Sequence, residues 1–180
     1  MKSILNSNYI YKSLGLILLI LVSGCGIYSF TGTNISPDIK TISIKNYINE
    51  TGLGPSRIGQ NFTEKLKEYF LQNTSLKLVK SDGDLQLEGS ITAYSLGPVG
   101  AQQGNSGALV TQTGQQNRLS IKIKSKFTNT KDETINFEKD FTHYEDFSSS
   151  QSLSAVETEK VEIVLERIIF DTFNASVANW

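Results

Sequence analysis

The chain has 180 residues, with 17 basic and 18 acidic side chains, so its formal net charge at neutral pH is −1. This balance argues against a nucleic-acid-binding domain, which carries a strongly basic surface. The single cysteine cannot form a disulfide within the chain, and no second thiolate is present for a structural zinc site. The length is sufficient for one domain with a hydrophobic core.

The N-terminal segment has the order of a bacterial lipoprotein signal. Lys2 and Lys12 supply positive charge, and residues 14–22 form an apolar run that is too short to span a bilayer unaided. The small residues Ser23 and Gly24 then lead directly to Cys25. The stretch Val-Ser-Gly-Cys that ends at this cysteine resembles a lipobox, the motif at which lipoprotein signals are lipidated and cleaved.

This resemblance implies that the Cys25 thiol carries diacylglycerol, that cleavage after Gly24 removes residues 1–24, and that the new amino group is acylated. Each buried CH₂ contributes roughly 0.8 kcal/mol, so two or three acyl chains hold a protein stably on a membrane. Residues 25–37 would then be a lipidated tether, and residues 38–180 a single domain. The alternative is an uncleaved hydrophobic anchor followed by a small buried cysteine.

The first part of the domain predicts a short strand, a loop and a helix. Residues 40–47 alternate in polarity, and residues 49–56 are rich in Gly, Pro and polar side chains. Ser56 is expected to cap a helix that runs to about Asn73. The apolar residues of this helix recur at helical spacing: Ile58, Phe62, Leu66, Tyr69 and Phe70.

Three further strands are predicted after a short strand at 76–79 and a turn at 80–84. The first contains a buried face of Leu85, Leu87, Ile91 and Ala93, and the second contains one of Leu119, Ile121, Ile123 and Phe127. The third covers 136–147, where Lys139 interrupts the apolar face of Phe137 and Phe141 and suggests a bulge. The Gly- and Gln-rich segment 97–117 is interpreted as a mobile hairpin loop, in preference to a dedicated ligand site.

A second helix is predicted at the C-terminal end. Ser154 and Glu157 have the spacing of a capping box, and the apolar positions that follow are Val164, Leu165, Ile168, Ile169, Phe173 and Val177. The resulting order, β-α-β-β-β-β-α, favours an α+β fold with two helices on one face of a mostly antiparallel sheet. The other sheet face carries Gln, Glu, Ser, Thr and Lys, and is expected to meet water or a polar partner.

The residues do not predict a catalytic or a metal site. His143 is the only histidine, and Glu145 and Asp146 are near it only in sequence. None of the motifs of serine hydrolases, zinc proteases or phosphate-binding loops is present. A histidine on a surface strand is the simpler interpretation.

Three stretches of the mature chain resemble the LptE family of lipopolysaccharide-assembly lipoproteins: GCGIYSFTG after the signal, NRLSIKIKSKFTN at 117–129 and FNASVANW at 173–180. The resemblance implies a non-enzymatic protein with two helices on a sheet of about four strands, so one of the short strands at 40–47 and 76–79 would be in excess. It also implies lipid anchoring on the periplasmic side of the outer membrane. There, family members plug the β-barrel LptD, assist its assembly and help to deliver lipopolysaccharide.

No ligand residue can be carried over from the family, so the contact prediction comes from charge alone. Lys122, Lys124 and Lys126 alternate with apolar residues and should project from one strand face, with Arg118 at the start of the strand. These cations could meet lipopolysaccharide phosphates or acidic groups of the barrel. The alternative is a solvated strand face, paired with Glu88 or Glu138.

A different class of function also fits the residues. The chain could be a periplasm-facing auxiliary lipoprotein of an envelope ABC-type transporter, which binds another protein or a lipid. In either case the residues call for no cofactor besides the lipid on Cys25, and no nucleic acid is expected as a partner.

Overall fold

The computed structural model describes residues 35–99 and 116–177, which fall within one compact unit, Gly32–Trp180. The predicted signal, Cys25, most of the tether and most of the Gly- and Gln-rich segment lie outside the described residues. Within these residues, no helix has the length and apolar character that crossing a membrane requires.

The centre of the fold is a six-stranded sheet, in which five strands follow the order β3-β1-β4-β5-β6 and β2 pairs with β4. The strands are β1 (Thr41–Ile44), β2 (Ile48–Asn49), β3 (Lys77–Val79), β4 (Leu85–Pro98), β5 (Gln116–Asn129) and β6 (Phe137–Ser148). The helices are α2 (Ile58–Asn73), α3 (Leu153–Val177) and the short 3₁₀ helix η1 (Glu133–Ile135).

The sheet is mixed and larger than the mostly antiparallel, four-stranded sheet that was expected. β1 runs parallel to both β3 and β4, and β2 is parallel to β4, whereas β4, β5 and β6 are antiparallel. The short strands predicted at 40–47 and 76–79 correspond to β1 and β3. Both are therefore part of the sheet, and neither is in excess. β1 and β3 can run parallel because α2, which lies between them in the sequence, returns the chain to the end of the sheet where β1 begins. A helix is the usual connection between parallel strands.

The Asp84 side chain stabilises the start of this parallel region through hydrogen bonds. Its carboxylate accepts hydrogen bonds from the backbone N–H groups of Lys40 (2.9 Å) and Thr41 (3.0 Å) and from the Thr41 hydroxyl (2.8 Å). These contacts join the residue that precedes β4 to the start of β1. In the sheet, β1 lies between β3 and β4. The hydrogen bond from the Lys40 N–H is the largest of the effects that lower the pKa of Asp84 from 3.8 to about 2.

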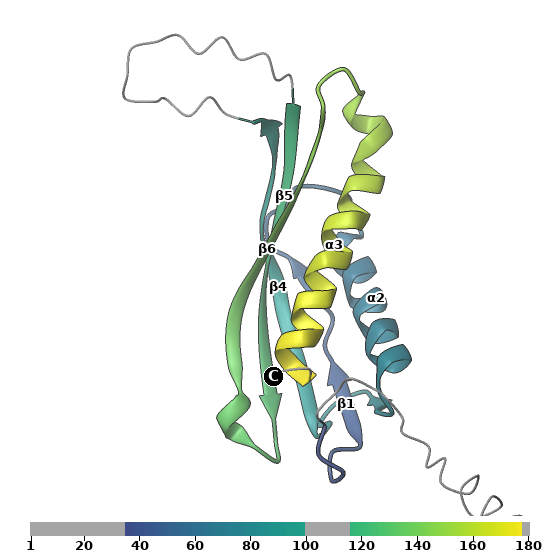
Figure 1. The fold of residues 1–180 in the computed structure, drawn as a ribbon, viewed down its shortest axis with the longest axis vertical. Helices are drawn as coiled ribbons and strands as arrows, with labels where there is room; N and C mark the ends of the chain where they lie inside the picture. Colours follow the sequence, from purple (N-terminus) through teal and green to yellow (C-terminus); the bar gives the residue numbers. More distant parts are fainter. Residues whose placement is uncertain (1–34, 100–115, 178–180) are drawn as a thin grey trace, which may run out of the picture. The chain divides into compact units, whose positions relative to one another are not determined.

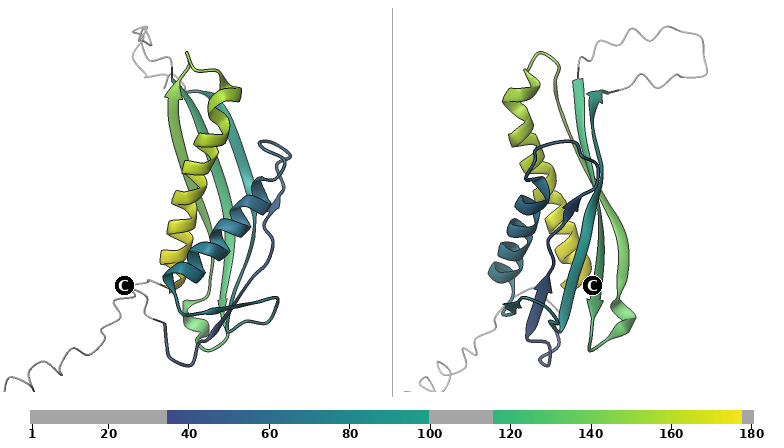
Figure 2. Two further views of the ribbon diagram at one scale, coloured as in Figure 1. Left: turned by 90° about the vertical axis from the view of Figure 1, so that its right-hand side faces the viewer. Right: turned by 180° about the vertical axis from the view of Figure 1, so that it is seen from behind.

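Both helices cover the same face of the sheet (Figures 1 and 2), as the apolar periodicities predicted. The core between these layers combines residues of α2, α3 and four strands, including Ile42, Phe62, Leu66, Leu87, Ile121, Leu165 and Ile168. The helices also contact each other through Phe173 of α3. Its ring packs edge-on against Tyr69 and Phe70, each with a centroid distance of 5.0 Å.

The predicted helix caps are not the ones that form. α2 begins at Ile58 after Arg57, which makes no side-chain capping bond, so Ser56 is not its cap. α3 begins at Leu153, so Ser154 lies within its first turn instead of preceding the helix. The Glu157 carboxylate instead accepts a 2.5 Å hydrogen bond from the Tyr94 hydroxyl, which joins the first turns of α3 to β4.

The bulge lies in β4 and not in the third long strand. The pairing of β5 with β6 runs without interruption, whereas the register of β4 against β5 shifts between Ile91 and Ala93. The extra residue reverses the alternation, so Ala93 is exposed and Tyr94 is buried. Lys139 needs no bulge because β6 is an edge strand, where its side chain is exposed above the Phe137 ring.

Tyr47 forms buried hydrogen bonds to helix α2 and to strand β5, and so connects the two. The Tyr47 N–H donates to the Thr63 hydroxyl on α2 (2.9 Å), and the Tyr47 hydroxyl donates to Ser125 on β5 (3.0 Å). Burial raises the pKa of Tyr47 to about 12. Gly89 leaves room for the Tyr47 ring, since a Cβ there would lie 2.6 Å from its Cε1 atom.

The buried face of α3 should account for a large share of the free energy of unfolding. Ile168→Ala is expected to lower this free energy by about 2–5 kcal/mol, because Ile168 is fully buried and truncation leaves a cavity. Phe170→Ala is the matched control, since Phe170 lies on the same helix and is 52% exposed. Urea unfolding of both variants measures the difference, and equal losses would contradict the assignment of the buried face.

Asp84 should make the stability depend on pH below about 4. Because its folded-state pKa is lowered from 3.8 to about 2, the ionised group stabilises the fold above the unfolded-state value. This contribution is lost as the pH falls through the folded-state value. Asp84→Asn should be less stable than the native chain at pH 6 and should lose less stability between pH 4 and pH 2. Urea titrations at the three pH values test this, and parallel pH profiles would refute it.

Candidate functional site

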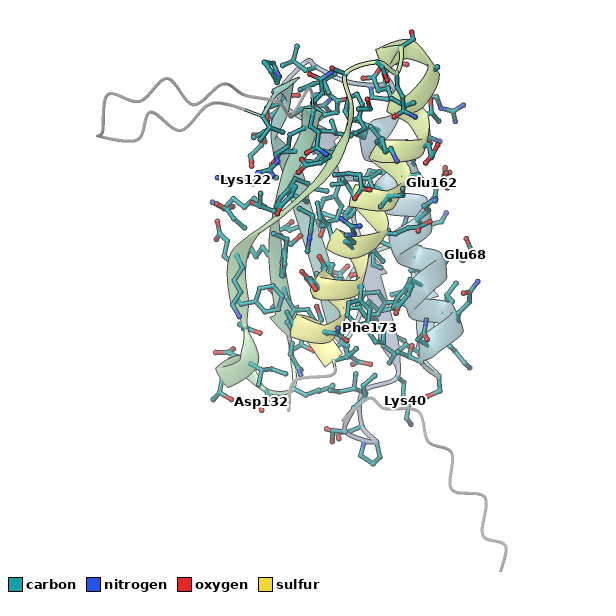
Figure 3. The ribbon with its side chains drawn as sticks, turned by 45° about the horizontal axis from the view of Figure 1, so that its top comes forward. Lys40, Glu68, Lys122, Asp132, Glu162 and Phe173 are labelled. Atoms are coloured by element: carbon teal, nitrogen blue, oxygen red, sulfur yellow. The ribbon has the colours of Figure 1, made fainter. Side chains whose placement is uncertain are left out.

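The sheet face opposite the helices, here called the outer face, carries the predicted basic residues. Along β5 the even-numbered side chains alternate with buried ones, so Arg118, Lys122, Lys124 and Lys126 all project from this face. Figure 3 shows Lys122 directed away from the helices, with Glu162 of α3 on the other side of the domain. The predicted orientation of the lysines thus agrees with the structure.

Acidic side chains on the neighbouring strands pair with two of these lysines. Lys124 contacts Glu138 on β6 at 2.5 Å, and Lys126 contacts Glu88 on β4 at 3.3 Å. Glu88 also pairs with Lys45, which follows β1, at 2.6 Å. These five residues form a row of alternating charge across the outer face, here called the charge ladder.

The charge ladder largely neutralises its own cations. The hydrogen bond from Lys45 and a second one from Lys126 lower the pKa of Glu88, and the hydrogen bond from Lys124 lowers that of Glu138. Such exposed pairs contribute little to stability, typically about 0–1 kcal/mol each. Their main consequence is that this part of the outer face carries little net positive charge.

Arg118 is also held by residues of β6. Its guanidinium contacts both carboxylate oxygens of Asp146, at 2.7 and 2.8 Å, and lies 3.8 Å from the centre of the Tyr144 ring. The arginine lowers the pKa of the Asp146 carboxyl below its ordinary value. Arg118 therefore contributes a rigid, charge-compensated group next to an aromatic ring that is 49% exposed.

Lys122 differs from the other three basic residues. Within the described residues, no carboxylate forms an ion pair with its ammonium group. The residue directly opposite on β6 is Thr142, and on β4 it is the bulge residue Ala93. Of the four predicted contact residues, Lys122 is the one whose charge is available to an anionic partner.

His143 lies on the helix-covered face and does not form a catalytic group with its neighbours in sequence. Its Nε2 is 2.6 Å from the Asp171 carboxylate of α3. Glu145 pairs with Arg167 of the same helix at 2.8 Å, and Asp146 lies on the outer face with Arg118. These contacts attach α3 to the edge strand β6, and in the described part of the chain the side-chain hydrogen bond of His143 is to a carboxylate and not to a hydroxyl or thiol nucleophile.

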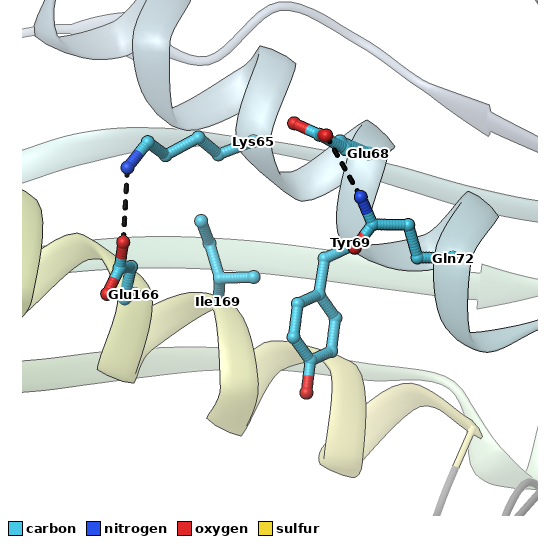
Figure 4. Close-up of a pocket in the computed structure, with 6 residues that line it drawn as sticks. All are labelled: Lys65, Glu68, Tyr69, Gln72, Glu166 and Ile169. Atoms are coloured by element: carbon cyan, nitrogen blue, oxygen red, sulfur yellow. Dashed lines mark hydrogen bonds and ion pairs between the residues drawn. The ribbon is translucent and has the colours of Figure 1, made fainter.

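A groove of about 340 Å³ lies between α2 and α3, and its charged lining residues are Lys65, Glu68 and Glu166 (Figure 4). Lys65 of α2 bridges Glu162 and Glu166 of α3, the second at 3.2 Å. On α2 itself, the Gln72 amide donates to Glu68 at 2.9 Å. Lys65 is therefore engaged by carboxylates of α3, whereas Glu68 contacts a neutral amide. No group of His, Cys, Asp and Glu that could hold a metal ion occurs among the described residues.

The cross-strand partners of the basic residues follow from a register that single-strand patterns do not reveal. The sequence suggests Glu88 and Glu138 as partners of the lysines, but it does not indicate the pairing of Arg118 with Asp146 or of His143 with Asp171. The first could have been found by aligning 118 with 146 as antiparallel neighbours. The second needed the position of α3 over β6.

Two helices on one face of a mixed sheet, with a polar outer face, define a small α+β domain. The family model described as LptE, lipopolysaccharide-assembly, matches residues 39–173, which is well over half of the chain. The chain belongs to the LptE family. A search of curated proteins found no match.

The solved structures that match this chain are distant from it in sequence. The protein XCC0632 from Xanthomonas campestris is 11% identical, with a TM-score of 0.52 over 77% of this chain and 86% of that one. A minor lipoprotein from Acinetobacter baumannii is 13% identical, with a TM-score of 0.46 over 74% and 89%. The rare lipoprotein B from Shewanella oneidensis is 14% identical, with a TM-score of 0.44 over 76% and 90%. At these identities the likeness concerns the fold alone.

Proposed function

We propose that the protein is a non-enzymatic, lipid-anchored subunit of lipopolysaccharide assembly on the periplasmic side of the outer membrane. In this proposal the domain is seated within a β-barrel of the LptD type, assists its assembly and helps to present lipopolysaccharide for insertion into the outer leaflet. The observation that carries the proposal is the LptE family match over residues 39–173.

The outer face supports a position inside a barrel. The lumen of a large outer-membrane barrel is polar, so a domain within it needs a polar surface with balanced charge. The charge ladder meets this requirement, because each of its acids contacts a lysine on an adjacent strand. The hydroxyl side chains of Ser120 and Thr142 extend the polar surface around Lys122.

Lys122 is the proposed contact for a phosphate of lipopolysaccharide or for an acidic group of the barrel, and Arg118, Lys124 and Lys126 are secondary contacts. A hydrogen bond to a charged group contributes about 1.5–3 kcal/mol. Cations that already contact carboxylates must exchange those partners before they can bind another anion, so they should contribute less.

The proposed function is tested by affinity purification from detergent-solubilised envelopes. An outer-membrane barrel of the LptD type should be the main protein recovered. Recovery of an inner-membrane transporter complex would instead support an auxiliary lipoprotein of an ABC-type transporter, and would overturn the proposed role.

Charge reversal at Lys122 should weaken the binding of this barrel or of purified lipopolysaccharide about tenfold. The triple variant K122E/K124E/K126E should weaken it at least as much, and binding by the native chain should decrease as salt screens the charges. Lys139→Glu is the matched control, because Lys139 is an exposed lysine that pairs with Ser125 on the other sheet face. If circular dichroism shows a retained fold and both affinities remain at the native value, the lysines serve only solubility.

Cys25→Ala should prevent lipid attachment, because the chain has no other thiol. Labelled fatty acid is expected in the native protein and not in the variant. Cys25→Ser provides a conservative control that also lacks a thiol. Equal incorporation into native and variant chains would refute the lipoprotein assignment of the N-terminal segment.

A further inference from the structure

A second basic surface lies at the β3 edge of the sheet, and only its Lys45, as a member of the charge ladder, enters the proposed function. It is a groove of about 370 Å³, here called the basic groove, to which three elements each contribute a lysine: Lys45 after β1, Lys67 on α2 and Lys80 after β3. The other lining residues are Ile44, Asn46, Leu78 and Val79. The lining therefore combines cations with aliphatic side chains and contains no carboxylate.

The topology of the short strands produces this groove. β3 pairs with β1 only from Thr41 to Ser43, and its last residue is Val79. The chain of β1 continues beyond that point, while the chain after β3 turns away toward β4. The position next to Ile44 and Asn46 is therefore not filled by a strand, and Leu78 at its border is 39% exposed.

Two of the three lysines have no ion-pair partner among the described residues. Lys45 contacts Glu88 at 2.6 Å, but no such contact is formed by Lys67 or Lys80. The acidic neighbours of Lys67 on α2 are engaged elsewhere. Glu64 accepts a hydrogen bond from Gln60 at 2.8 Å, and Glu68 accepts one from Gln72 at 2.9 Å. The convergence of like charges has an electrostatic cost that an anionic ligand would offset.

The lining favours carboxylates spaced along a polypeptide over a single phosphate. Compact phosphate sites are usually built from backbone N–H groups at a helix N-terminus or in a turn, whereas Lys67 lies in the middle of α2. Aliphatic residues between the lysines would contact apolar side chains between acidic ones. The segments of the given sequence outside the described residues contain no Asp or Glu, which favours a separate chain as the source of such side chains.

We propose that the basic groove binds an acidic, partly aliphatic segment of a partner protein. The carboxylates of the segment would contact Lys67 and Lys80, and an aliphatic side chain would pack on Leu78. This assignment does not depend on the proposed barrel role, because the groove lies at the β3 edge of the sheet, whereas Lys122 lies on the interior strand β5.

The test uses the full-length protein in detergent and a labelled, end-blocked peptide of alternating glutamate and leucine, with binding followed by fluorescence anisotropy. K67Q/K80Q should weaken binding about tenfold, since at least one charge-assisted contact is lost. K40Q/K139Q is the matched control, because it removes two exposed lysines outside the groove, and its affinity should stay within about twofold of the native value.

Two further measurements distinguish this proposal from general attraction to anions. Leu78→Gln keeps every charge and should also weaken peptide binding, because it removes the aliphatic contact. A peptide with glutamine in place of glutamate should not bind. The proposal is overturned if K67Q/K80Q and K40Q/K139Q lose affinity equally. It is also overturned if millimolar inorganic phosphate displaces the peptide as effectively as unlabelled peptide does, since the groove would then be a simple phosphate site.

Discussion

The two-residue alternation of β5 is the constraint on which the rest of the structure depends. This strand lies between β4 and β6, and its odd-numbered residues from Leu119 to Phe127 form the floor of the core. The intervening residues, from Arg118 to Lys126, must then project from the outer face. One strand therefore builds both the surface that the helices bury and the surface proposed to meet a partner, and a shift of one residue would disrupt both.

The charged residues show how the fold controls a surface of mixed sign. Carboxylates on β4 and β6 lie opposite the cations of β5, so most of these charges are compensated within the domain. Among the lysines without an ion pair in the described part of the chain, Lys122 lies on the outer face, and Lys67 and Lys80 share the basic groove. The cation on β5 and the pair at the β3 edge are the two positions proposed to contact anionic partners.

The sequence predicts the local features of this fold better than the features that depend on contacts between distant segments. The two helices and the long strands were predicted close to their observed bounds, because side-chain periodicity reports directly on which face is buried. The direction of the short strands was not predicted correctly, because a mostly antiparallel sheet was expected. Periodicity is the same in parallel and antiparallel strands, so it cannot show that β3 and β4 both run parallel to β1. The bulge after Ile91 was likewise misplaced, because one extra residue changes the phase of alternation without a distinct sequence signal.

The sequence by itself determined the fold class, the buried faces, the family resemblance and the common orientation of Lys122, Lys124 and Lys126. Each of these follows from residue order or from spacing along one element. Only the tertiary structure decided that Lys124 and Lys126 are paired while Lys122 is not, that Arg118 is held by Asp146, and that Lys67 and Lys80 share a groove. Ion pairs between strands depend on register and on short distances between remote segments, and these distances exist only once the sheet and helices have assembled.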